Sequence, residues 1–144
     1  MPSFKPTTLW EASPHTLAKL EIIGRYLYLW FAIVGSNPNN RRLVYIDGFA
    51  GPGRYTNSDK SSPLVALLAA KYALNTFPGK LSEKEFCFLF VEKNPKFADS
   101  LRETISAISW PAQFKWNVEN GSFEEKVGDI LNTFRREGKQ LAPT

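Results

Sequence analysis

The chain has 144 residues, 43% of them hydrophobic and 22% charged, and this balance is typical of a single globular domain. Its formal net charge of +4 comes from scattered lysines and arginines, which permits contact with nucleic acid but does not require it. A single cysteine excludes an internal disulfide framework, and no apolar stretch reaches the roughly 20 residues needed to cross a bilayer. We therefore expect a cytoplasmic protein with no membrane contact, no metal site and no signal peptide.

The N-terminal part of the chain predicts an irregular arm followed by one long helix. Residues 1–12 show no periodic pattern. Ser13-Pro14 is typical of an N-cap followed by proline in the first helical turn, and apolar residues then recur at helical spacing as far as Gly35. We assign residues 1–40 to this arm and helix.

A short strand and a glycine turn come next. The continuous apolar run from Leu43 to Ile46 predicts a strand covered on both faces. Asp47 follows the run directly, and Gly51 and Gly53 then mark a tight turn. Because ligands bind at the carboxyl ends of strands in open α/β sheets, this loop is the first candidate site.

The middle of the chain alternates between helices and a strand. Serine–proline and asparagine–proline pairs begin helices over residues 62–77 and 94–108. Between them, residues 86–91 form a second fully apolar run that predicts another strand covered on both faces. We expect Cys87 within it to be a buried hydrophobe, and the run ends in Glu92.

The last unit is an edge strand followed by a helix. Residues 113–119 alternate between apolar and polar side chains, which predicts a strand with one exposed face. Ser122 and Glu125 form a capping box for a final helix, which we expect to end at Gly138. Strands alternating with helices predict a parallel sheet. The expected fold class is therefore α/β: a partial, three-layer Rossmann-like fold with about three parallel strands, flanking helices and a preceding N-terminal helix.

Polar residues at the three strand ends suit a nucleoside-type ligand. Asp47 and Glu92 end the first two strands, and Asn120-Gly121-Ser122 follows the third. A carboxylate can accept hydrogen bonds from both ribose hydroxyls. A pyrophosphate-binding loop would carry a third glycine and no acid before it, so Asp47 favours a ligand with a cationic group. S-adenosylmethionine, which has an amine and a sulfonium, meets this requirement.

The stretch Asp47–Gly53, with the sequence D-G-F-A-G-P-G, resembles the cofactor loop of class I S-adenosylmethionine-dependent methyltransferases. Over the first half of the chain, the wider pattern is similar to one group of these, the three-Cys-motif partner proteins. The residues and segments that carry this similarity are His15, Leu17, Leu20, Tyr26–Trp30, Tyr45–Tyr55 and Ser62–Leu64. The resemblance implies S-adenosylmethionine as cofactor, a three-Cys-motif protein as partner, and a methyl acceptor that is unknown.

The resemblance also implies roles for individual residues. Asp47 would hold the methionine amino group through water, and Glu92 would bind the ribose hydroxyls. Ser122 stands where such enzymes often place an acid near the adenine amino group, and Phe123 would cover the adenine. Gly51 and Gly53 would let the backbone approach the methionine part of the cofactor, and Gly48 and Phe49 would be further cofactor-binding positions of the same loop.

The chain covers only part of such a fold. A full methyltransferase sheet has about seven strands, so residues 41–144 correspond to its cofactor-binding half, and the catalytic residues stay unknown. The outer edge of the first strand would be unpaired, which predicts self-association, pairing with another chain, or a segment folded over the edge. A second interpretation stays open, namely a non-catalytic module that keeps the fold and acts through a protein or nucleic-acid partner. Whether the sequence is a fragment, a truncated gene product or a natural short protein stays open as well.

Overall fold

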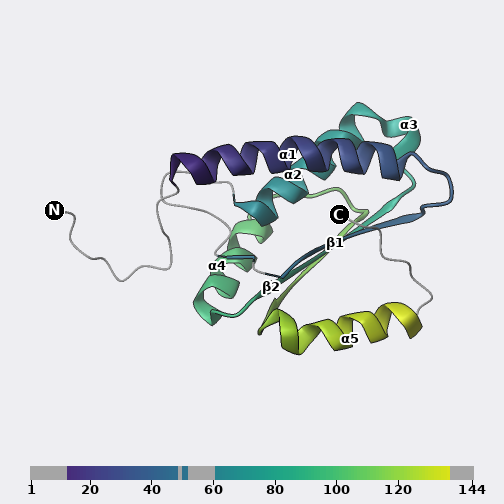
Figure 1. The fold of residues 1–144 in the computed structure, drawn as a ribbon. Helices are drawn as coiled ribbons and strands as arrows, with labels where there is room; N and C mark the ends of the chain where they lie inside the picture. Colours follow the sequence, from purple (N-terminus) through teal and green to yellow (C-terminus); the bar gives the residue numbers. More distant parts are fainter. Residues whose placement is uncertain (1–12, 49, 52–60, 137–144) are drawn as a thin grey trace.

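In a computed structural model, the chain is described over residues 13–48, 50–51 and 61–136 (Figure 1). The expected arm at residues 1–12 and the expected helix end at Gly138 lie outside these ranges. The elements of the described part follow in this order: α1 (Pro14–Gly35), β1 (Arg42–Asp47), α2 (Ser62–Thr76), α3 (Pro78–Leu81), β2 (Glu85–Glu92), α4 (Pro95–Ser106), β3 (Phe114–Asn120) and α5 (Phe123–Arg136).

The three strands form one parallel sheet in the order β1-β2-β3. In its register, Leu43 lies beside Phe86, which in turn lies beside Phe114. Each pair of neighbouring strands is joined through a helical crossover, as parallel pairing requires. The α/β fold class expected from the sequence is therefore confirmed, including the N-terminal helix.

One face of the sheet carries the hydrophobic core. Alternate residues of β2 point to this face, and Phe86, Phe88 and Phe90 are all buried. The ring of Phe31 from α1 packs 5.7 Å from that of Phe86, measured between centroids. Helices α2 and α4 add small and branched side chains to the same cluster, including Ala70. In Figure 1, α1 and α2 lie on one side of the sheet and α5 lies on the other.

The opposite face of the sheet is covered less than the apolar runs predict. Cys87 and Leu89 on β2 are half-buried, and so is Ile46 on β1, so the prediction of a buried Cys87 is wrong. These side chains stay half-buried because fewer described helices cover this face. On this side α5 is the described helix that packs against β2, whereas α1 and α2 both lie on the other side (Figure 1). On β3, the alternation is as predicted, with Phe114 and Val118 buried.

Local signals fix the helix starts. Ser13 Oγ accepts a hydrogen bond from Thr16 N at 3.1 Å, and Asn94 Oδ1 accepts one from Lys96 N at 2.9 Å. The short helix α3 is not predicted from the sequence, because the proline that ends α2 also begins one further helical turn. Over the described ranges, no helix has the length and apolar character of a membrane span.

Candidate functional site

The first candidate residue, Asp47, is the last residue of β1 and lies at the carboxyl edge of the sheet. Its Oδ2 accepts a hydrogen bond of 2.7 Å from the hydroxyl of Ser62, the first residue of α2. This places a carboxylate at a helix N-terminus, where the helix dipole stabilises negative charge. Asp47 is half-buried, so part of its side chain is accessible to solvent or a ligand.

The glycine turn reaches across from β1 to the end of β2. Ala50 N donates to Val91 O at 3.0 Å, and Gly51 N donates to the carboxylate of Glu92 at 2.7 Å. Gly51 has φ +76°, a left-handed conformation that side chains with a Cβ rarely adopt. The turn therefore needs glycine at this position, and the Gly51 N–H is directed at an acid on the neighbouring strand.

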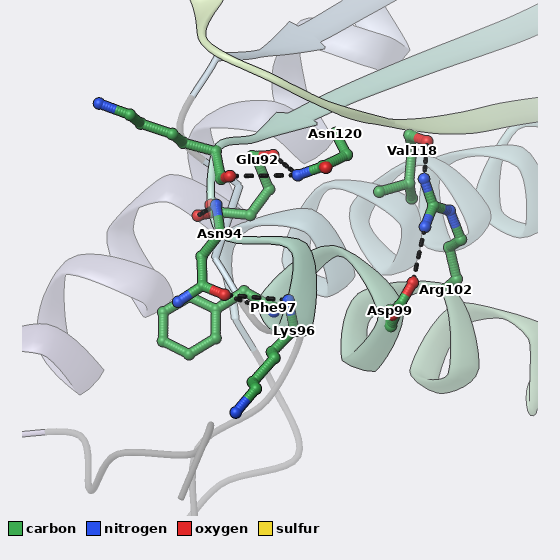
Figure 2. Close-up of polar contacts among 9 residues, drawn as sticks. Glu92, Asn94, Lys96, Phe97, Asp99, Arg102, Val118 and Asn120 are labelled. Carbon is green, nitrogen blue, oxygen red and sulfur yellow. Dashed lines mark hydrogen bonds and ion pairs between the residues drawn. The ribbon is translucent and has the colours of Figure 1, made fainter.

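Glu92 holds the ends of β2 and β3 together (Figure 2). Its second carboxylate oxygen accepts from Asn94 N at 3.1 Å, and its carbonyl oxygen accepts from the side-chain amide of Asn120 at 3.0 Å. Gly121 N donates to the same carbonyl at 2.9 Å. A carboxylate has about four acceptor positions, and the two backbone donors use two of them. The group is thus held in place and can still accept two further hydrogen bonds.

Phe123 begins α5 and packs directly on the loop after β1. A Cβ placed on Gly48 would lie 2.8 Å from ring carbon Cδ2 of Phe123, so the ring lies flush against the glycine backbone. The neighbouring Ser122 uses its hydroxyl to cap α5, accepting from Glu125 N at 3.2 Å. The predicted capping bond is confirmed. The role of Ser122 in base recognition stays a prediction.

The structure therefore brings six of the predicted site residues to one edge of the sheet. They are Asp47, Gly48, Gly51, Glu92, Ser122 and Phe123. The other two, Phe49 and Gly53, lie outside the described residues. Over the described ranges, no group of three or more His, Cys, Asp or Glu side chains is placed to hold a metal ion.

Two residues matter at this edge although their roles are not predicted from the sequence. Ser62 anchors Asp47, and the serine–proline pattern marks it only as the start of a helix. Tyr45 lies two positions before Asp47, with its ring 6.4 Å from that of Phe90. Burial raises the pKa of the Tyr45 hydroxyl, and the negative charge of Asp47 raises it further. The phenol therefore stays neutral beside Asp47. The sequence indicates Tyr45 only as one residue of an apolar strand.

The sequence matches no protein-family model, and a search of curated proteins found no match either.

Proposed function

We propose that the carboxyl edge of β1 and β2 binds S-adenosylmethionine, and that the chain is the cofactor-binding half of a methyltransferase-like protein with an unknown methyl acceptor. The observation that carries the proposal is the 2.7 Å hydrogen bond between Gly51 N and the carboxylate of Glu92. This bond joins a left-handed glycine turn to an acid at the adjacent strand end. The resemblance of the loop sequence supports the same cofactor.

The geometry suits the separate parts of this cofactor. Glu92 keeps two acceptor positions, which is the number that the two ribose hydroxyls require. Asp47 offers a carboxylate to the cationic amine and sulfonium end. The ring of Phe123 at Gly48 supplies an apolar surface for the adenine. The sulfonium is already activated for methyl transfer, so the protein needs mainly to align donor and acceptor.

Two partner predictions accompany the proposal. The first is a three-Cys-motif protein, which rests on the sequence resemblance alone. The second is pairing at the outer edge of β1, which hydrogen-bonds to β2 along its other edge and to no other described strand. Both are proposals, as is a cytoplasmic location.

Isothermal titration calorimetry with S-adenosylmethionine and S-adenosylhomocysteine tests the proposal. We expect both to bind, and expect Asp47→Ala and Glu92→Ala each to weaken binding by about 10- to 100-fold, the equivalent of one hydrogen bond to a charged group. Glu85→Ala is the matched control, because Glu85 lies on the same strand as Glu92 but at the opposite end. It should leave binding unchanged.

The absence of heat with either compound would contradict the proposal and favour the non-catalytic module. Binding that survives both site substitutions would place the cofactor elsewhere on the molecule.

A further inference from the structure

Helix α1 carries a second apolar surface that faces away from the core. Leu20, Leu27 and Phe31 point inward and are buried. On the opposite side, four large apolar side chains are more than half exposed, and we call them the outer stripe: Ile22 at 67%, Tyr26 at 52%, Leu29 at 54% and Ile33 at 70%. In Figure 1, α1 runs along one side of the sheet, on the same side as α2.

The second half of α1 has no polar side to present to water. Residues 26–35 contain no charged side chain, and they are apolar around the whole circumference of the helix apart from two tyrosine hydroxyls and the indole N–H of Trp30. Helices of this kind are normally buried on all sides. The outer stripe therefore marks an interaction surface.

The spacing of the outer stripe points to a second copy of the same helix. The intervals from Ile22 to Tyr26, Leu29 and Ile33 are four, three and four residues, which is the heptad spacing of a helix that packs along another helix. The same intervals read identically in both directions. In an antiparallel pair, Ile22 of one copy would therefore meet Ile33 of the other, and Tyr26 would meet Leu29. Such a self-complementary contact is the rule in two-fold symmetric dimers.

The charges on α1 favour the antiparallel arrangement. Lys19, Glu21 and Arg25 all lie in the first half of the helix, and Arg25 pairs with Glu21 at 3.0 Å. A parallel pair would bring the two charged halves side by side, with like charges near one another. An antiparallel pair places each charged half beside the uncharged half of the other copy, and it also opposes the two helix dipoles.

The apolar area reaches the lower end of what a specific dimer needs. Tyr72 on α2 is also exposed, and it lines a groove of about 820 Å³ between α1 and α2 that Leu29 also lines. With the outer stripe this makes five large side chains, and roughly 100 Å² from each gives about 500 Å² per copy, or about 1,000 Å² in total, which is the size at which specific interfaces begin. A standard interface buries about 800 Å² per partner. We propose that this protein forms a two-fold symmetric dimer through antiparallel contact of α1.

Size-exclusion chromatography with multi-angle light scattering tests the dimer on the purified chain. We expect a dimer for the unchanged protein and a folded monomer for Leu29→Glu, which places a charge in the centre of the contact. Leu131→Glu is the matched control, because Leu131 is an exposed leucine on α5, across the sheet from α1. It should stay dimeric. A monomer at all concentrations of the unchanged protein, or a dimer of Leu29→Glu, would overturn the proposal.

Disulfide trapping tests the orientation and does not depend on breaking the dimer. In a Cys87→Ala background, Ile22→Cys and Ile33→Cys are purified separately and oxidised alone or mixed. The antiparallel contact predicts a cross-linked dimer in the mixture and little in either variant alone. Only in the mixture do a Cys at position 22 of one copy and a Cys at position 33 of the other lie within disulfide reach. Cross-linking of each variant with itself would show a parallel contact, and no cross-link in the mixture would show that the dimer uses another surface, such as the edge of β1. Either result would overturn the antiparallel arrangement.

Discussion

Replacing Glu92 with alanine should destabilise the protein even without a ligand. The carboxylate accepts hydrogen bonds from Gly51 N at 2.7 Å and from Asn94 N at 3.1 Å. The bond to Gly51 is partly buried, whereas the bond to Asn94 is exposed, so water replaces only the second without loss.

The loss of the partly buried bond between Gly51 N and Glu92 determines how much the Glu92→Ala substitution destabilises the protein. A hydrogen bond to a charged group contributes about 1.5–3 kcal/mol, and we expect the free energy of unfolding to fall by about this amount. For a domain of this size, the melting temperature should fall by roughly 5–10 °C.

Urea unfolding followed by tryptophan fluorescence measures the change, since the chain has four tryptophans. The comparison is Glu85→Ala, which removes a half-exposed ion pair with Arg42 and should cost less than about 1 kcal/mol. If Glu92→Ala were as stable as the unchanged protein, or if Glu85→Ala cost more, the turn would not depend on this carboxylate.

Three further predictions concern the same sheet edge. Gly51→Ala should cost about 1–2 kcal/mol through backbone strain, because its φ is +76° and no atom of the described residues lies within 4 Å of the added Cβ; urea unfolding checks this, and no loss would refute it. Gly48→Ala should lower the free energy of unfolding by about 1–3 kcal/mol, because the added Cβ would collide with the ring of Phe123. Calorimetry should also show weaker S-adenosylhomocysteine binding, and an unchanged affinity would show that the Phe123 ring does not contact the cofactor. Because burial raises the pKa of Tyr45 above the unfolded value of about 10, stability is intact below that pH and falls above it by up to about 1.4 kcal/mol per pH unit. Tyr45→Phe should remove the part of this stability loss that comes from Tyr45. Urea midpoints of both proteins, compared at about pH 9 and about pH 11, would show the difference, and an identical loss in both would contradict the prediction.

The elements that local signals control could be predicted from the sequence. A capping side chain marks the starts of α1, α4 and α5, at Ser13, Asn94 and Ser122, and each makes its bond within four residues. The strands follow from their apolar runs and the parallel sheet from the alternation of strands and helices. The burial of Cys87 could not be predicted, because it depends on which elements cover the second face of the sheet rather than on the strand itself.

The sequence predicts which residues lie together at the carboxyl edge of the sheet, but it does not predict how they contact one another. Strand ends and glycines identify Asp47, Gly51 and Glu92, since parallel strands bring their carboxyl ends to one edge. The bond between Gly51 and Glu92 joins residues 41 positions apart, and the bond between Asp47 and Ser62 depends on how the crossover returns α2 to the sheet. Such distances are set by tertiary packing, and no local pattern encodes them.

Amide-resolved NMR during a titration with S-adenosylhomocysteine tests the central claim most directly, because it reports which backbone groups a ligand approaches. The account predicts saturable shifts of the amide signals of Gly48, Gly51 and Gly121, at the carboxyl edge of the sheet. An unchanged spectrum, or shifts confined to the opposite edge around Arg41 and Lys84, would contradict it.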